Sequence, residues 1–392
     1  MFDAVLLASY GGPEGVREIE PFLDKILTGK RVPSDRRAAV VERYARFSGI
    51  SPLPNECRRF LNELNDAFST NPKRPRLYWG NLYSNPTFDD AFSQMESDAA
   101  KSVLVFPTSA FGSPQSCQRY RLAVQTAFNK RAESFVQSCR VAFTPPFFDL
   151  PAFRRSIADA LLTELAWSEL ESERLFAPEL SAGRNTRLIL FSAHSLPVSD
   201  DEQAQYKRQL TNAVASTLEA LLKSPAYGAK PADNVDASDS SLNGFPQKKT
   251  TLIPTSRQNE VVSEIQALLR KNSLDAALVF QSRSGSPSTP WLGPSPEEYL
   301  RKYVKKVPQL EQVVVSPIGF FFENMETIYD LDVEFKETCE ELGIKYRRAL
   351  CCGSSLQLVD AVCRLAELSP EDFPSCRCAK GSCDLSCRFK RE

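Results

Sequence analysis

The chain is predicted to fold as an α/β protein with two halves, each built around a parallel sheet. Its 392 residues are enough for two or three domains of ordinary size. Short apolar runs alternate along the chain with longer amphipathic segments, which is the pattern of βαβ units. Polar residues or Gly and Pro follow each apolar run, as expected where a strand ends and a turn begins.

Six apolar runs are expected to be strands, and the longer segments between them are expected to be helices. Because strands and helices alternate, the strands should be parallel, and ligands should bind beyond their carboxyl ends. The expected strands are 4–8, 76–80, 102–107, 187–192, 276–281 and 312–317. The most distinct expected helices are 19–27, 35–47, 151–170, 201–222, 257–270 and 325–342.

The expected division of the chain is a domain over residues 1–150, a second over 151–368 and a cysteine-rich tail over 369–392. Within the second domain, the segment 224–251 is rich in Pro, Asp, Ser, Gly and Asn and poor in large apolar residues. This composition is typical of a surface insertion or a disordered loop. No chemistry is assigned to it.

Composition excludes several classes of function. The 48 Lys and Arg residues balance 49 Asp and Glu residues, for a net charge of −1, so no overall field favours nucleic acid. No run approaches the ~20 apolar residues that span a bilayer, and no membrane contact is expected. The sequence begins without a basic leader or a cleavage site, which predicts a cytoplasmic protein. Its 11 cysteines are then expected to be buried, reactive or metal-binding rather than disulfide-bonded.

The single histidine, His194, directly follows the expected strand 187–192. A parallel sheet exposes side chains to a ligand site at this position. A neutral imidazole can accept a proton or bind a divalent metal near neutral pH, and no other histidine is available to do so. A hydrogen-bonded structural role is the alternative, and the position alone does not decide between the two.

Three carboxylates recur at every fourth position of the expected helix 325–342, namely Glu326, Asp330 and Glu334. This spacing places them along one helical stripe. A solvated acidic face is the ordinary explanation of such a stripe. Hard oxygen ligands that leave the carboxyl end of a sheet could instead guide a hydrated divalent cation.

Four cysteines crowd into the tail, namely Cys376, Cys378, Cys383 and Cys387. Thiolates at this density could bind Zn²⁺ or an iron–sulfur cluster. A redox-active tail without fixed structure is the third possibility, and the spacing alone does not select among them.

Five motifs, taken in order, resemble the ferrochelatase family, and the resemblance extends from the N-terminus to about Leu368. It implies two Rossmann-like, chelatase-type domains with a porphyrin cleft between them. It also implies a lyase that inserts ferrous iron into a porphyrin in heme biosynthesis, with Fe²⁺ as a substrate. The motifs are Tyr10–Pro13, Gly49–Leu53, Phe191–Pro197, Phe280–Arg283 with Trp291–Pro294, and Glu326–Asp332.

The resemblance implies that His194 and Glu326 form the catalytic pair, which delivers the metal and removes pyrrole protons. It does not apportion these two roles between them. Asp330 and Glu334 would extend the carboxylate track outward. The family commonly has Asp-His shortly before the glutamate, where this chain has Glu323 and Asn324, so a second histidine role is absent.

Finer features resemble the bacterial branch that metallates coproporphyrin III to coproheme. In that branch, the residues that match Tyr10, Arg43, Tyr44, Ser51 and Tyr120 contact the tetrapyrrole. Protoporphyrin IX, which would give protoheme, is the alternative substrate. A cobalt or sirohydrochlorin chelatase is less consistent with the order of the motifs. A porphyrin-binding or heme-binding protein that keeps the fold without turnover is the alternative from a different class.

Some family members also carry a [2Fe-2S] cluster held by three C-terminal cysteines and one internal cysteine. Cys117 stands where that branch places the internal ligand. The four tail cysteines exceed the three that are needed, so one would be spare. The resemblance therefore favours a [2Fe-2S] cluster, with zinc as the second possibility.

Overall fold

The computed structural model describes residues 1–29, 32–69, 71, 73–171, 187–198, 200–222, 269, 274–283 and 289–370. The expected insertion at 224–251 lies outside these residues, as do the expected helix at 257–270 apart from Leu269 and the tail beyond residue 370. The chain divides into two compact units. Unit 1 comprises Met1–Pro146, Phe322–Met325 and Gly353–Glu392, and unit 2 comprises Phe147–Phe321 and Glu326–Cys352.

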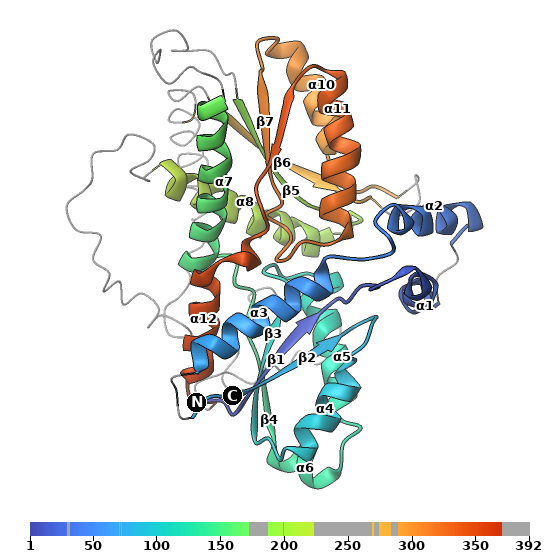
Figure 1. Cartoon of the computed structure of the whole chain (residues 1–392), viewed down its shortest axis with the longest axis vertical. Coiled ribbons are helices and arrows are strands. Elements are labelled where there is room, and N and C mark those ends of the chain that lie inside the picture. Colours follow the sequence, from blue (N-terminus) through green and yellow to red (C-terminus); the bar gives the residue numbers. More distant parts are fainter. Residues whose placement is uncertain are drawn as a thin grey trace, which may run out of the picture. The chain divides into compact units, whose positions relative to one another are not determined.

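Unit 1 contains a parallel sheet in which the described residues form four strands in the order β2-β1-β3-β4 (Figure 1). The central strand β1 is buried along its whole length because it lies between two neighbours and is covered on both faces. The strands are β1 (Ala4–Ser9), β2 (Arg76–Asn81), β3 (Ser102–Pro107) and β4 (Arg140–Phe143).

Helices cover both faces of this sheet. One face packs against α4 and α5 through side chains such as Leu6, Phe92 and Val105. The helices of unit 1 are α1 (Val16–Leu27), α2 (Ser34–Ala45), α3 (Leu53–Phe68), α4 (Phe88–Ser97), η1 (Pro114–Gln118), α5 (Arg119–Phe128), α6 (Glu133–Ser138) and α12 (Leu356–Glu367).

Helix α12 belongs to unit 1, although it falls within the span 151–368 that was expected for the second domain. It lies beside α3 (Figure 1), and the amide of Phe2 donates to the carbonyl of Ala366 over 2.8 Å. The chain therefore returns to its first sheet at α12, through contacts between residues that are far apart in the sequence.

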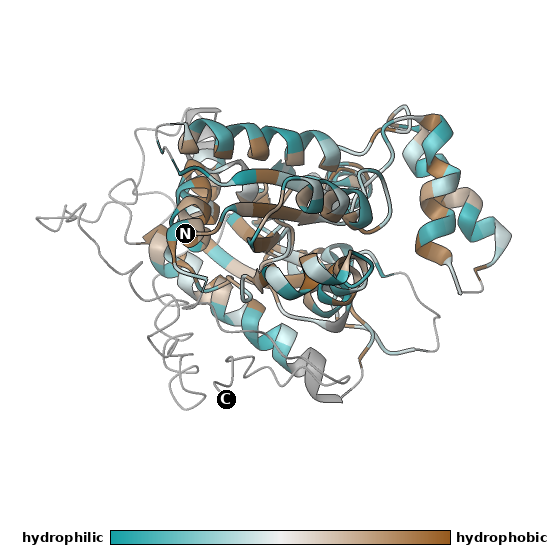
Figure 2. Cartoon of the chain, turned by 90° about the horizontal axis from the view of Figure 1, so that it is seen from below, coloured by the Kyte–Doolittle hydropathy of each residue, from teal (hydrophilic) through white to brown (hydrophobic). Residues whose placement is uncertain are grey.

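Unit 2 contains the second parallel sheet, with its described strands in the order β6-β5-β7-β8. Apolar side chains of β5, β7, α10 and the helix after β7 form its core. In Figure 2, strands of the chain are largely brown, whereas the helices alternate between brown and teal. The strands are β5 (Arg187–His194), β6 (Leu274–Gln281), β7 (Gln312–Ser316) and β8 (Lys345–Arg348). The helices are α7 (Pro151–Glu171), α8 (Asp200–Leu222), α10 (Pro296–Lys306), η5 (Thr327–Phe335), α11 (Lys336–Glu341) and η6 (Cys352–Ser354), whose last residues belong to unit 1.

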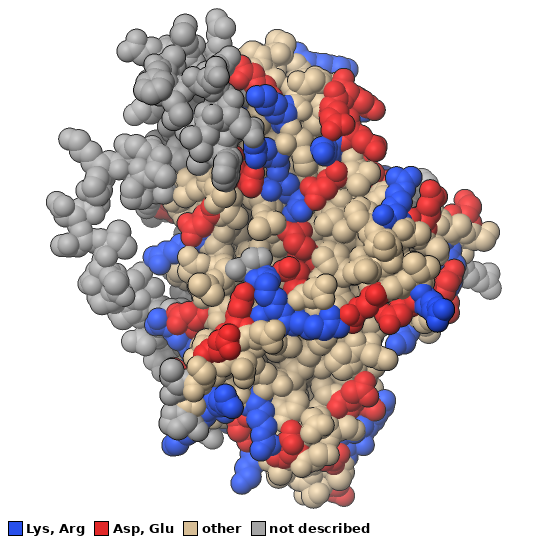
Figure 3. All heavy atoms as spheres, viewed as in Figure 1, with Lys and Arg blue, Asp and Glu red and all other residues tan. Residues whose placement is uncertain are grey.

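All six expected strands are confirmed, and their bounds shift by no more than two residues. The short strands β4 and β8 were not expected. Each lies at an edge of its sheet. Strand β8 carries Lys and Arg at three of its four positions, and β4 has only three consecutive apolar residues, a shorter run than those by which the buried strands were recognised. On the molecular face in Figure 3, acidic and basic side chains are intermingled, in keeping with the balanced composition.

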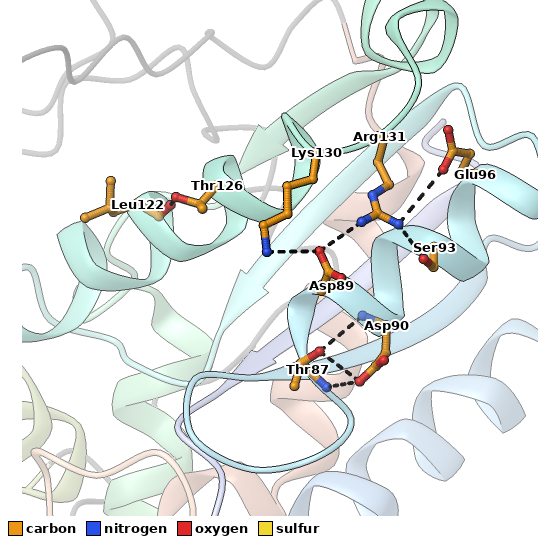
Figure 4. Close-up of polar contacts among 9 residues, drawn as sticks. All are labelled: Thr87, Asp89, Asp90, Ser93, Glu96, Leu122, Thr126, Lys130 and Arg131. Carbon is orange, nitrogen blue, oxygen red and sulfur yellow. Dashed lines mark hydrogen bonds and ion pairs between the residues drawn. The ribbon is translucent and has the colours of Figure 1, made fainter. Parts of the chain in front are cut away.

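Helix α4 begins with a capping box (Figure 4). The hydroxyl of Thr87 accepts the amide of Asp90 over 3.2 Å, and the Asp90 carboxylate accepts the amide of Thr87 over 2.8 Å. The bond from the Thr87 amide, and a second one from the Thr87 hydroxyl to the same carboxylate over 2.8 Å, lower the pKa of the Asp90 carboxyl. Beyond the cap, the guanidinium of Arg131 bonds to Asp89 and Ser93, which ties the end of α5 to α4.

Replacing Thr87 by Ala should lower the free energy of unfolding by about 1 kcal/mol, because the amide at the start of α4 loses its acceptor. Thr126→Ala is the matched control. The exposed hydroxyl of Thr126 only bonds back to the carbonyl of Leu122 over 2.7 Å, and this type of bond does not stabilise a helix. Urea-induced unfolding of both variants measures the difference, and equal midpoints would contradict the role of the cap.

Candidate active site

His194 is the last residue of β5, where the strand leaves the core, and its side chain is 31% exposed. The β5–β6 ladder continues one step further, since the amide of Ser195 donates to the carbonyl of Gln281 over 2.7 Å. On the imidazole, Nδ1 lies 2.6 Å from the carbonyl oxygen of Ser195. A carbonyl only accepts, so Nδ1 carries a proton and Nε2 faces the other way.

Glu326 lies where the chain re-enters unit 2, immediately before η5. Its Oε1 is 3.5 Å from Nε2 of His194, and its side chain is 44% exposed. The two candidate catalytic residues, 132 positions apart in the sequence, are thus brought together at the carboxyl edge of the second sheet.

A close backbone crossing lets the chain reach this edge. After β7, the amide of Gly319 donates to the carbonyl of Ser192 over 3.1 Å. A Cβ at position 319 would lie 2.6 Å from the Cβ of Ala193, so only glycine fits without a shift of the backbone. The loop therefore passes directly over the end of β5 on its way to Glu326.

The His194 imidazole has a pKa of about 9, well above its ordinary value. Burial lowers this pKa, but the charge of Glu326, its hydrogen bond, the carbonyl of Ser195 and the charge of Asp330 together raise it. At neutral pH the imidazole is therefore protonated and faces a carboxylate. The pair holds one exchangeable proton at Nε2.

The helix expected over 325–342 is present, but its central part is the π-helix η5 rather than an α-helix. A π-helix needs one extra residue per turn, so it rotates the acidic stripe relative to a regular helix. Asp330 is buried, at 7% exposure, and accepts a hydrogen bond from the hydroxyl of Ser282. Glu334 is half-buried on the same helix.

Asp332 is a structural residue. Its two carboxylate oxygens accept bonds from the guanidinium of Arg348 over 2.8 and 2.7 Å, and Oδ1 also accepts the hydroxyl of Tyr346 over 2.8 Å. Burial and this carboxylate raise the pKa of Tyr346. The bidentate pair joins η5 to the edge strand β8.

Two of the expected porphyrin contacts lie in one aromatic cluster of unit 1. The ring of Tyr10 is 4.7 Å from that of Tyr83 and 6.3 Å from that of Phe22. Tyr44 packs on the same Phe22 at 6.0 Å. Arg43 lies half-buried in the last turn of α2, beside Tyr44 in the sequence.

The other two expected contacts are buried in unit 1. Ser51 is 3% exposed, and its hydroxyl accepts the amide of Leu53 over 3.4 Å. Tyr120 is 4% exposed, with its hydroxyl 3.5 Å from that of Thr108, and burial raises its pKa. Contact between these five residues and a tetrapyrrole stays a prediction.

Of the candidate cluster ligands, only Cys117 lies among the described residues. It is buried in η1, and its thiol donates to the carbonyl of Ser113 over 3.5 Å. Cys376, Cys378, Cys383 and Cys387 lie outside the described part of the chain. Within the described part, no group of three or more His, Cys, Asp or Glu side chains is arranged to hold a metal ion.

The family model for ferrochelatase matches residues 2–235 and 247–369. The chain belongs to the ferrochelatase family. Among curated relatives, it is 30% identical over 368 residues to the ferrochelatase of Rhodopirellula baltica, covering 93% of this chain and 86% of that protein. It is 28% identical over 365 residues to the coproporphyrin III ferrochelatase of Streptomyces coelicolor, covering 92% and 84%.

Among solved structures, the chain is similar to SirB from Bacillus subtilis, with a TM-score of 0.47 and 12% identity, covering 95% of this chain and 99% of that one.

The family membership makes the protein a metal chelatase of heme and porphyrin biosynthesis, as expected from the motifs. No helix among the described residues is long and apolar enough to cross a membrane.

Replacing Glu326 by Gln should lower the pKa of His194 from about 9 toward its ordinary value, because the charge and the carboxylate acceptor are lost. In the wild type, the raised pKa stabilises the folded protein fully below about pH 6.5. That contribution is lost as the pH rises toward 9. Since the protein has a single histidine, NMR of its imidazole gives the titration without assignment.

Glu334→Gln is the control for this titration, because Glu334 is on the same helix, whereas the carboxylates that raise the pKa are those of Glu326 and Asp330. A wild-type histidine that titrates near 6.5 would show that the pair does not form.

Proposed function

We propose that this protein inserts Fe²⁺ into coproporphyrin III to give coproheme, with His194 and Glu326 as the catalytic pair. The observation that carries the proposal is the approach of His194 Nε2 to Glu326 Oε1 within 3.5 Å at the carboxyl edge of β5, in a chain of the ferrochelatase family. Family membership supports the class of reaction. The pair supplies the groups that the reaction needs.

Metallation replaces two pyrrole N–H bonds by bonds from nitrogen to iron, so one Fe²⁺ enters and two protons leave. The raised pKa keeps the imidazole protonated at neutral pH, so the Glu326 carboxylate is then the member of the pair that can accept a proton. An imidazole that has lost its Nε2 proton can bind a divalent metal through the same atom. The two residues thus act together on proton and metal, without a fixed division of the roles.

We place Asp330 and Glu334 on the outer carboxylate path for iron. Both follow Glu326 on η5, and carboxylate oxygens suit a hydrated divalent cation. The hydrogen bond from Ser282 gives Asp330 one fixed orientation. Asp332 is excluded from this path, because its oxygens already bind Arg348 and Tyr346.

Coproporphyrin III carries four carboxylates and protoporphyrin IX carries two. The curated relative from Streptomyces coelicolor, named for coproporphyrin III, supports the first substrate. In unit 1, Tyr10 and Tyr44 offer aromatic surface and hydroxyl donors in one cluster, and Arg43 offers a cation for a carboxylate. Ser51 and Tyr120 are the remaining proposed contacts.

Anaerobic turnover with Fe²⁺ should consume coproporphyrin III faster than protoporphyrin IX, followed by loss of free porphyrin. His194→Ala and Glu326→Gln should each lower kcat by about 100-fold or more, because proton transfer at the metal is lost. Glu341→Gln, at an exposed position of α11, should keep wild-type turnover.

Each alternative gives a different result in the same assay. Faster use of protoporphyrin IX would identify that porphyrin as the substrate. Binding of both porphyrins without metallation, measured by their fluorescence, would indicate a porphyrin-binding protein and would overturn the catalytic assignment.

We further propose that Cys117 and three of the four tail cysteines hold a [2Fe-2S] cluster, with zinc as the second possibility. The donor chemistry fits, since thiolates are the usual ligands of such clusters, and Cys117 provides a buried thiol.

Replacing Cys117 by Ser should remove the visible absorption and the iron of the anaerobically purified protein, since one of the four ligands is lost. Cys139→Ser is the control, because Cys139 is a buried cysteine of the same unit outside the proposed ligand set. Zinc in place of iron in the wild-type protein would select the second possibility. Bound iron that survives in Cys117→Ser would exclude Cys117 as a ligand.

A further inference from the structure

We propose that Gln281 is a positioning residue for the His194–Glu326 pair. It holds the main chain of Glu326 and does not contact the substrate. Its side chain is buried, at 4% exposure. The inference rests on the proposed function, because it concerns the geometry of the same pair. It adds a residue to which neither the motif analysis nor the family comparison assigned a role.

The register of the second sheet places Gln281 beside the histidine. Gln281 ends β6 and pairs with His194 at the end of β5. Its main-chain carbonyl accepts the amide of Ser195 over 2.7 Å, which extends the ladder just past the histidine. The backbone of Gln281 therefore has a fixed position relative to the imidazole.

The side chain of Gln281 connects β5 to the start of η5. Its Nε2 donates to the main-chain carbonyl of Glu326 over 2.9 Å, and its Oε1 accepts the hydroxyl of Ser192. The orientation of the amide is forced, because the carbonyl of Glu326 can only accept. Ser192 is itself fully buried, two residues before His194 on the same strand.

The hydrogen bond from Gln281 acts at the start of η5, where the helix itself does least to fix the position of Glu326. The chain passes from unit 1 into unit 2 between Met325 and Glu326, and Glu326 caps η5 without a side-chain bond to the helix. A hydrogen bond from the buried side chain at the end of β6 to the Glu326 carbonyl fixes the main chain that carries the carboxylate. The separation of the carboxylate from His194 then depends on Gln281.

The next residue holds the same helix at a second point. Ser282 has a φ of 61°, in the left-handed region that few residues other than glycine adopt. Consecutive side chains of an extended strand point to opposite faces. The left-handed turn instead lets Ser282 donate its hydroxyl to Asp330, while Gln281 holds Glu326. Strain of this kind is often retained at functional sites.

The test compares Gln281→Met with Gln312→Met. Methionine keeps most of the volume of the side chain and removes both hydrogen bonds, and Gln312 is an equally buried glutamine at the opposite end of the same sheet, in β7. With coproporphyrin III and Fe²⁺, Gln281→Met should lower kcat by about tenfold or more with little change in the KM for porphyrin. Gln312→Met should leave both constants unchanged.

A double-mutant cycle separates positioning from packing. In the Glu326→Gln background, Gln281→Met should cause little further loss of kcat, because its effect passes through Glu326. Additive losses, an unchanged kcat in the single variant, or an equal loss in Gln312→Met would each overturn the inference. Ser192→Ala, which removes one of the two bonds, should give a smaller loss in the same direction and serves if Gln281→Met does not fold.

A readout without turnover keeps this inference distinct from the proposed function. The single imidazole has its own ¹⁵N resonances, and these should shift in Gln281→Met but not in Gln312→Met. If the wild-type protein metallates neither porphyrin, the proposed function fails. The shift of the imidazole resonances still tests the hydrogen bond from Gln281 to Glu326. An unchanged imidazole signal in folded Gln281→Met would overturn the inference.

Discussion

The pairing of β5 with β6 is the interaction on which the candidate site depends. Eight consecutive residues of the two strands are in register, and the ladder ends with His194 opposite Gln281. Parallel pairing brings the carboxyl ends of strands to one edge, so His194 at the end of β5 and Gln281 at the end of β6 are neighbours. A shift of either strand by one residue would turn the side chains of that strand to the opposite face of the sheet.

The glycine at position 319 sets a second constraint on the same edge. Its main chain lies against Ala193, closer than any side chain would allow, and this crossing directs the chain toward Glu326. The site is therefore assembled from the ends of three strands and a loop. Its precision comes from backbone hydrogen bonds, whereas the reactive side chains are half exposed.

The carboxylates of η5 have separate roles, although they look alike in the sequence. Glu326 faces an imidazole, Asp330 is held by Ser282, and Asp332 is neutralised by Arg348. The imidazole, the hydroxyl and the guanidinium differ in charge, so each carboxylate has a different electrostatic environment. The stripe of Glu326, Asp330 and Glu334 is thus not a uniformly solvated face, because Asp330 is buried.

The sequence alone determined the six apolar strands and the place of His194 at the end of one of them, because apolar periodicity and strand-end position are local properties of the chain. It could not reveal that α12 returns to the first sheet, that Asp332 binds Arg348, or that Gln281 reaches the carbonyl of Glu326. These contacts join polar residues that are distant in the sequence, so the apolar periodicity of the chain does not indicate them. Only the tertiary structure decided them, since each of these bonds needs two separate elements to lie side by side.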